Sequence, residues 1–224
     1  MSAAPERGTV LVCFAVKEEA NSFTSLSSTP RVQTLLTGIG PRNAERAIRA
    51  ALARQRPRLV LSCGFAGALR SGLRTGTVLF ALDGQKDLEA ALVAAGARPT
   101  RFHCCDRVAS TAAQKQALRQ ATGADAVEME SQTIRAICRE KNVPSATLRV
   151  ILDEAEEDLP LDFNLLMTAD QRMDYRKLAL ALVRAPAKIG ALRRLQKQSR
   201  AAAENLAQVL SKLITVLEGR SGLF

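Results

Sequence analysis

The sequence predicts an α/β fold, with a central mixed, largely parallel twisted sheet that is flanked by helices. Short apolar runs alternate with segments of helical periodicity, and the connections between them are short. Several runs are continuously apolar, which is typical of strands that are covered on both faces. At 224 residues and 47% hydrophobic composition, the chain is long enough to bury the core of one such domain.

The strands are predicted from apolar runs that end in turn residues or acids. They cover residues 9–16, 31–37, 59–63, 77–82, 100–105, 124–128 and 145–152. The second run closes on Gly38-Ile39-Gly40-Pro41, where two glycines and a proline at the first helical position indicate a strand-to-helix turn. The third run is expected to end at the glycine-rich stretch Gly64-Phe65-Ala66-Gly67.

The helices are predicted from apolar residues at helical spacing. They cover about residues 43–55, 87–95, 112–121 and 130–142, and a short helix or loop opens at Lys17. Gly123 is expected to stop the helix over 112–121. After Pro160 the chain becomes helical and basic, with a break at Pro186. We expect one domain over residues 1–224, with a core at about 9–160 and a helical C-terminal region at about 161–218.

Composition excludes several classes of protein. No run of eighteen apolar residues occurs, so no membrane-spanning helix is expected, and the N-terminal residues lead directly into a strand, which predicts a cytoplasmic protein. The five cysteines form no CxxC pair and are expected to be reduced and buried. His103 is the only histidine, so we expect no histidine-based triad and no histidine-rich metal site. No metal and no cofactor are expected.

The net charge of +10 is concentrated toward the C-terminal end of the chain. From Gln171 onward there are eleven Lys and Arg residues against three Asp and Glu residues, a net of +8. Apolar residues at helical spacing between Leu192 and Leu217 form a stripe that is expected to pack on the sheet. One tyrosine, no tryptophan and arginines that alternate with leucines argue against nucleic acid as a partner. A Lys/Arg-rich amphipathic surface suits peripheral contact with anionic lipid.

Acids or glycines follow four of the predicted strands. They are Glu18 and Glu19, the stretch Gly64 to Gly67, the triplet Glu128-Met129-Glu130, and Asp153. Ligands of α/β sheets collect at the carboxyl ends of strands. A carboxyl at the end of an apolar strand is partly desolvated, which raises its pKa toward a value that is useful for acid–base chemistry. The sequence therefore predicts a site that contains these acids.

Six motifs occur in an order that resembles a known family. They are Phe14-Ala15-Val16-Lys17-Glu18-Glu19-Ala20, Thr37-Gly38-Ile39-Gly40, Cys63-Gly64-Phe65-Ala66-Gly67, Gly76-Thr77-Val78, Ala126-Val127-Glu128-Met129-Glu130-Ser131 and Arg149-Val150-Ile151-Leu152-Asp153. Over roughly residues 9–160 the series resembles the nucleoside phosphorylase/nucleosidase superfamily, which includes methylthioadenosine/S-adenosylhomocysteine nucleosidase. The acidic segment 153–160 and the basic helices beyond it resemble the hopanoid-associated phosphorylase-like branch, thought to act as nucleosidases on adenosylhopane.

The resemblance implies roles in breaking an N-glycosidic bond. Asp153 would be the general acid toward the purine ring, and Glu19 the base that activates water, although Glu18 and Glu19 are adjacent and either is also a candidate helix-start acid. Glu130 would accept hydrogen bonds from the ribose hydroxyls, and Met129 would pack against the sugar.

Three further residues are expected to contact the base, and one is left open. The first three are Gly64 and Phe65 in the glycine-rich stretch and Val108 in the loop from residue 106 to 110. The one left open is Glu128, which would bind the ribose or pair internally with Arg149.

The resemblance also bears on the attacking group. Phosphorylases of this superfamily carry one arginine shortly before the glycine-rich turn and another near the first loop. Here Leu61 and Ser62 lead into the turn and Arg58 lies further back, so a phosphate dianion would lack its cations and hydrolysis is favoured.

The resulting prediction is a hydrolase that cleaves a purine (adenine) nucleoside with a hydrophobic 5′ substituent, such as adenosylhopane. It would act on a small molecule as a homo-oligomer, with a dimer favoured. The alternatives are a phosphate-dependent purine nucleoside phosphorylase and a non-catalytic nucleoside- or nucleic-acid-binding protein on the same scaffold.

Overall fold

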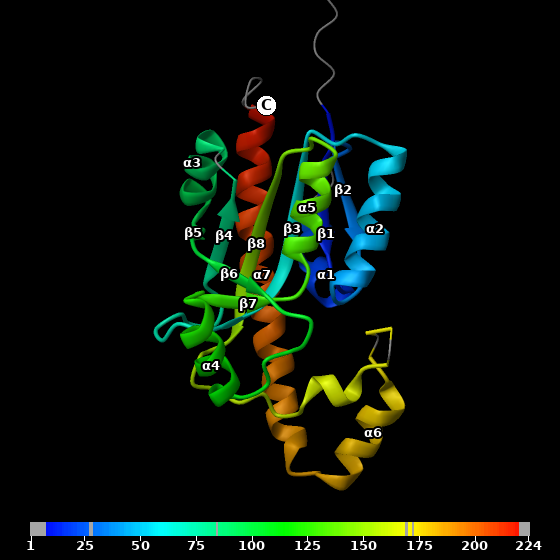
Figure 1. Ribbon diagram of the computed structural model, residues 1–224, viewed down its shortest axis with the longest axis vertical. Coiled ribbons are helices and arrows are strands. Elements are labelled where there is room, and N and C mark those ends of the chain that lie inside the picture. The colour runs from blue at the N-terminus through cyan, green and yellow to red at the C-terminus, as the bar shows by residue number, and fades with distance from the viewer. Residues whose placement is uncertain (1–7, 27–28, 84, 169, 172, 220–224) are drawn as a thin grey trace, which may run out of the picture.

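The computed structural model describes residues 8–26, 29–83, 85–168, 170–171 and 173–219, which form a mixed sheet with helices on both faces (Figure 1). The strands are β1 (Val10–Phe14), β2 (Val32–Leu36), β3 (Leu59–Ala68), β4 (Val78–Leu82), β5 (Arg98–Pro99), β6 (Phe102–Cys104), β7 (Ala126–Glu128) and β8 (Ser145–Asp153). The helices are α1 (Lys17–Leu26), α2 (Pro41–Arg54), α3 (Lys86–Ala95), α4 (Ala112–Thr122), α5 (Ser131–Glu140), the 3₁₀ turn η1 (Phe163–Leu166), α6 (Tyr175–Arg184) and α7 (Lys188–Gly219). The predicted fold class is confirmed.

The sheet forks along one edge of β3. Its order is β2-β1-β3-β8-β4-β5, and β7 pairs with both β3 and β6. Most pairings are parallel, while β4 runs antiparallel to β8 and β7 antiparallel to β3. Along the edge of β3 opposite β8, β1 pairs with Leu59–Ser62 and β7 pairs with Gly67 and Ala68. Residues 63–66 between them have no strand partner on that edge within the described chain, and the fork opens there.

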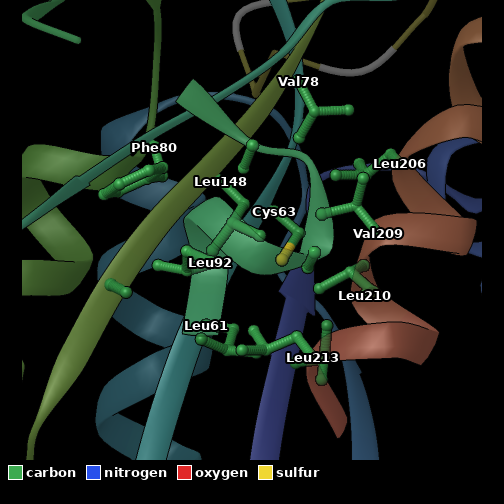
Figure 2. Packing of buried hydrophobic residues seen from close by; sticks show 14 of the residues in the cluster. Leu61, Cys63, Val78, Phe80, Leu92, Leu148, Leu206, Val209, Leu210 and Leu213 are labelled. Atoms are coloured by element: carbon green, nitrogen blue, oxygen red, sulfur yellow. The ribbon is translucent and has the colours of Figure 1, made fainter. Parts of the chain in front are cut away.

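Alternating residues of the central strands face two hydrophobic layers, as the period of a strand requires. In β1, Val10, Val12 and Phe14 pack in the layer that contains α1, α3 and α7, whereas Leu11 and Cys13 pack in the layer with α2 and α5. Figure 2 shows leucines of α7 against Leu61, Cys63 and Leu148 of the sheet in the larger layer.

The apolar stripe of α7 packs on the sheet only in its C-terminal part. Ala202 and Leu206 through Leu217 are buried at the core positions, whereas Leu192 and Leu195 are half-buried. With 32 residues the helix is about 48 Å long, and the nine-residue β8 spans only about 30 Å. The N-terminal part of α7 therefore extends past the sheet together with α6, as Figure 1 shows. Pro186 separates the two helices, as expected.

The prediction that the third strand ends at Cys63 is wrong, because β3 continues through the glycine-rich stretch to Ala68. Gly64 stays in register with Arg149 of β8 at a φ of 151°, which favours glycine. A Cβ atom on Gly64 would lie 2.6 Å from Oε1 of Glu19. Glycine is therefore required by the close approach of this carboxylate and not by a turn.

Two predictions from composition can be compared with the fold. Cys13, Cys63 and Cys138 are free and buried as expected, but the prediction of burial is wrong for Cys104 and Cys105, which are free and half-buried where β6 ends. Within the part of the chain that the structure describes, no helix is both long enough and apolar enough to cross a membrane.

Truncation of Leu206 tests whether the C-terminal part of α7 belongs to the core. We expect Leu206→Ala to lower the free energy of unfolding by roughly 2–5 kcal/mol, because it removes a fully buried side chain and leaves a cavity. The matched control, Leu26→Ala, truncates a leucine that is 59% exposed and should change stability by less than about 0.5 kcal/mol. Urea unfolding measures both, and equal stabilities would contradict the packing described here.

Candidate active site

A cavity of about 260 Å³ lies at the fork of β3. Most of the site residues expected from the sequence line it: Glu19, Phe65, Val108, Glu128, Met129, Glu130 and Asp153. Gly64 is not among the residues that line it, because its position is taken up by the contact with Glu19. The end of β1, the fork of β3, the end of β7 and the end of β8 thus converge on one cavity.

Glu19 is held by backbone amides that follow β1 and by one within β3. Its Oε2 accepts hydrogen bonds from Ala15 N at 2.9 Å and Val16 N at 3.3 Å, so it also caps the start of α1. Its Oε1 accepts from Phe65 N at 2.8 Å, the amide that the fork leaves without a strand partner. Burial raises the pKa of Glu19, although these amides and Arg149 oppose the shift. Glu18, in contrast, is exposed and lies outside the cavity.

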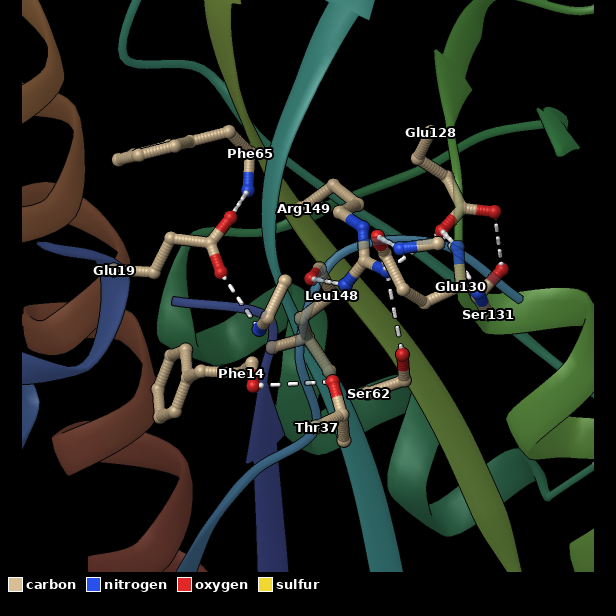
Figure 3. A network of polar contacts seen from close by, with 12 residues as sticks. Phe14, Glu19, Thr37, Ser62, Phe65, Glu128, Glu130, Ser131, Leu148 and Arg149 are labelled. Atoms are coloured by element: carbon tan, nitrogen blue, oxygen red, sulfur yellow. Dashed lines mark hydrogen bonds and ion pairs between the residues drawn. The ribbon is translucent and has the colours of Figure 1, made fainter. Parts of the chain in front are cut away.

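Arg149 of β8 connects Glu128 of β7 with Glu130 before α5 and is buried, with 1% of its side chain exposed (Figure 3). Its Nη2 donates to Oε2 of Glu128 at 2.6 Å and lies 3.4 Å from Oε2 of Glu130. Two further acceptors are Ser62 Oγ and the carbonyl of Leu148, each at 3.3 Å. The buried guanidinium is thus surrounded by acceptors from three strands and the start of α5.

Glu128 is occupied by contacts within the protein. Besides Arg149, Oε2 accepts from the amides of Glu130 at 3.1 Å and Ser131 at 2.8 Å, and Oε1 accepts from Ser131 Oγ at 2.8 Å. Burial alone would raise the pKa of Glu128, but Arg149 and the Ser131 donors hold it below its ordinary value. Of the two roles left open for Glu128, the structure contains the internal pair with Arg149.

Glu130 is buried with fewer partners. Its Oε1 accepts from Gly40 N at 2.9 Å, which ties the end of β7 to the start of α2, and its contact with Arg149 is long. Burial raises the pKa of Glu130 to about 7 against the effect of Arg149, and the negative charges of Glu128 and Glu19 add to the shift. The pKa values of these two neighbouring glutamates are therefore shifted in opposite directions.

Asp153 lies at the end of β8 beside a cation that the sequence did not indicate. Nζ of Lys115, in α4, is 2.5 Å from Oδ2 of Asp153. Burial raises the pKa of Asp153, while Lys115 opposes the shift and Glu157 adds to it. Gly67 makes room for the acid, since a Cβ atom there would lie 3.2 Å from Oδ2.

Apolar side chains from the region beyond residue 158 cover the cavity. They are Leu159, Phe163, Met167, Met173 and Leu195, which we call the roof. Hydrogen bonds fasten the roof to the loop before α4: Asn164 Oδ1 accepts from Val108 N and its Nδ2 donates to Val108 O, both at 2.9 Å. Leu159 N also donates to Ser110 O at 2.8 Å.

Lys115 and the roof are the parts of the site that the sequence reasoning missed. Lys115 stands in a helix whose other residues are exposed or half-buried, so periodicity gave no signal for it. The apolar residues of the roof were recognisable in the sequence, but nothing local placed them over the acids. Within the described residues, no group of three or more His, Cys, Asp or Glu side chains is arranged to hold a metal ion.

The raised pKa of Glu130 makes the effect of its removal depend on pH. Between about pH 4.5 and 7 the folded protein binds a proton at Glu130 that the unfolded chain has released, so the stability contribution of this group falls as the pH rises. We therefore expect the stability of Glu130→Gln relative to wild type to increase from pH 5 to pH 8, by on the order of 2 kcal/mol. Urea unfolding at both pH values measures the difference.

A pH-independent difference between Glu130→Gln and wild type would contradict the assigned pKa shift. Glu140→Gln is the matched control, because Glu140 is an exposed acid with its pKa lowered by Arg49. Its effect relative to wild type should not rise between pH 5 and pH 8.

Solved structures that share the fold include a futalosine hydrolase and 5′-methylthioadenosine/S-adenosylhomocysteine nucleosidases. Futalosine hydrolase of Helicobacter pylori strain 26695 has a TM-score of 0.69 at 16% identity, over 94% of this chain and 98% of that chain. The 5′-methylthioadenosine/S-adenosylhomocysteine nucleosidase of Helicobacter pylori gives 0.70 at 15%, over 94% and 99%. That of Neisseria meningitidis gives 0.69 at 18%, over 93% and 99%. At these identities the likeness shows the shared fold.

A family model described as the phosphorylase superfamily matches residues 81–215, which is more than half of the chain. No protein with a curated function matches the sequence. The matched region contains the Glu128-Met129-Glu130 triplet and Asp153, and it extends beyond residue 160 into α7, further than the motifs indicated. The chain therefore belongs to the phosphorylase superfamily.

Proposed function

We propose that the protein is a nucleosidase, which hydrolyses the N-glycosidic bond of a purine nucleoside that carries an apolar 5′ substituent. The observation that carries the proposal is the convergence of three buried carboxyl groups, those of Glu19, Glu130 and Asp153, on one cavity under an apolar roof. N-glycoside hydrolysis requires a proton for the departing base, support for a cationic sugar and an activated water. Three acids in different environments can divide these tasks.

Asp153 is assigned the role of the general acid, which donates a proton to the departing base. Its burial raises its pKa, so it holds a proton more readily near neutral pH than an exposed aspartate does. As the bond between C1′ and the base breaks, the proton moves to a ring nitrogen and the electron pair of the bond goes to the base. The base would lie near Phe65 and Val108, which line the same cavity.

Glu130 and Met129 are assigned to the sugar and Glu19 to the water. Glu130 has free acceptor capacity beside its bonds to Gly40 and Arg149, which suits the ribose hydroxyls. Met129 lines the cavity next to it and offers an apolar surface. Glu19 is fixed by three amides, so its carboxylate is positioned to accept a proton from water. Glu128, saturated by internal donors, would position Glu130 and Arg149.

Hydrolysis fits the cavity better than phosphorolysis. A phosphate dianion at Glu19 would meet a carboxylate, and its charge would need cations there. Arg58 donates to the carbonyl of Leu217 from the opposite end of β3. Arg107 is the cationic side chain among the described residues that line the cavity, and it favours phosphorolysis as the second candidate.

The roof favours a nucleoside whose 5′ substituent is apolar. The relatives described above are named as acting on 5′-methylthioadenosine, S-adenosylhomocysteine and futalosine, which supports a 5′-modified nucleoside. At about 260 Å³ the cavity is below the usual size of ligand pockets, so a large substituent would extend past the roof. Adenosylhopane is a candidate substrate of this kind.

Helix α6 supports the proposal of contact with a lipid surface. No residue of α6 is buried, and Tyr175, Leu180 and Val183 are 73%, 49% and 78% exposed. The exposed side chains of Arg176, Lys177 and Arg184 accompany them, and we call this set the α6 face. Apolar and basic side chains on one exposed face match an anionic membrane. The homodimer and the cytoplasmic location remain predictions.

Replacement of Asp153 tests the proposed chemistry. We expect wild type to release adenine from 5′-methylthioadenosine, S-adenosylhomocysteine or an adenosylated lipid at rates that do not depend on phosphate. Asp153→Asn should lower kcat/KM by about 10²- to 10⁴-fold, because the amide cannot donate the acidic proton. Chromatography of the released base measures both.

Asp87→Asn is the matched control, since Asp87 is exposed in the first turn of α3 and should leave activity unchanged. Strict dependence on phosphate would establish phosphorolysis instead. Full activity of Asp153→Asn would show that Asp153 is not the general acid.

Co-sedimentation with vesicles tests the α6 face. We expect binding to vesicles of phosphatidylcholine with phosphatidylserine, weaker binding at high salt and none to phosphatidylcholine alone. Leu180→Gln with Val183→Gln should weaken binding at least about tenfold, because both apolar side chains leave the interface. Leu26→Gln, which alters an exposed leucine of α1, should bind as wild type does. Equal binding of all three proteins would rule out the α6 face as the contact.

A further inference from the structure

Lys115 is buried in a helix that otherwise faces solvent or is half-buried. All residues of α4 are described, and only Lys115 among them is buried, with 0% of its side chain exposed. Removing an ammonium group from water costs several kcal/mol unless it is paired and hydrogen-bonded. Apolar packing therefore does not explain this position, and its polar contacts must.

Three oxygen atoms surround the Lys115 ammonium. Nζ donates to the carbonyls of Glu154 and Glu157, both at 2.7 Å, and lies 2.5 Å from Oδ2 of Asp153. The two carbonyls accept hydrogen bonds from Nζ, and the Asp153 carboxylate completes the set as the partner of an ion pair. The polar contacts of Lys115 are therefore all with Asp153 and the chain that directly follows it. Leu152, the neighbour of Asp153 in β8, offers no side-chain hydrogen bond to it.

We propose that Lys115 is a positioning residue for catalysis: it fixes Oδ2 of Asp153 and stabilises the carboxylate that remains after the proton has passed to the base. The proposal rests on the proposed function. When the Asp153 proton moves to the ring nitrogen, the bond from C1′ to the base breaks and its electron pair goes to the base. Water then bonds to C1′ and gives a proton to Glu19, and both carboxyl groups exchange protons with solvent before the next turnover.

The ammonium acts in opposite directions before and during the reaction. In the free protein it disfavours the protonated form of Asp153, and in the transition state it stabilises the negative charge that develops there. Glu157 opposes it from the loop after β8, and the cavity also presents Glu19, Glu128, Glu130 and Arg107. These groups stay in place when Lys115 alone is replaced. A change in the pKa of Asp153 and a change in the maximal rate can then both be attributed to Lys115.

The pH profile of Lys115→Met distinguishes catalysis from support of the fold. We expect the maximal rate of base release to fall about 100-fold, because the developing carboxylate loses its cation. The alkaline limb, which reports loss of the Asp153 proton, should move up by about one pH unit or more. Lys141→Met is the matched control, because Lys141 is exposed, and it should keep the wild-type profile.

A lower rate with an unmoved alkaline limb would show that Lys115 supports only the fold and would overturn the proposal. If wild type releases no base from any nucleoside, the proposed function has failed instead. A second measurement needs neither substrate nor a Lys115 variant: ¹⁵N NMR of the lysine side chains in wild type and Asp153→Asn. We expect the Lys115 Nζ signal to be that of an ammonium and to change with the titration of Asp153. A signal indifferent to Asp153→Asn would also overturn the proposal.

Discussion

The buried ion pair between Arg149 and Glu128 is the interaction on which the site depends. Both side chains are almost fully removed from water, and breaking such a pair by removing one partner typically costs about 3–5 kcal/mol. The guanidinium also faces Glu130, so without it two carboxylates would lie buried side by side at the end of β7. Because Glu128 takes the short contact, Glu130 keeps a raised pKa and spare acceptor capacity.

The fork of β3 opens a cavity beside this ion pair. One edge of β3 pairs first with β1 and then with β7. Between these two pairings, the amide of Phe65 donates to Glu19 instead of a neighbouring strand. The two glycines of β3 leave space for acids: Gly64 for Glu19 and Gly67 for Asp153. The glycine-rich stretch that lines the cavity is therefore part of an irregular strand, and not the turn after a strand that we expected.

Two buried cations contact the acids of the site in different ways. Arg149 binds the carboxylate of Glu128 and faces Glu130, whereas Lys115 joins Asp153 to the carbonyls of the chain that follows it. Because each acid has its own combination of burial and charge, acids within one cavity acquire different tendencies to hold a proton. That separation is what an acid, a sugar contact and a base for water would need.

The sequence by itself determined the alternation of strands and helices, the acids at the strand ends and the membership of the superfamily. These properties rest on local patterns: apolar runs, turn residues and motif order. Only the tertiary structure decided that Glu19 and not Glu18 enters the cavity, that Glu128 pairs with Arg149, and that β3 continues through its glycines. It also brought Lys115 to Asp153 from a helix 38 positions earlier in the chain. Such partners are chosen by burial and by distances across the fold, which no local pattern records.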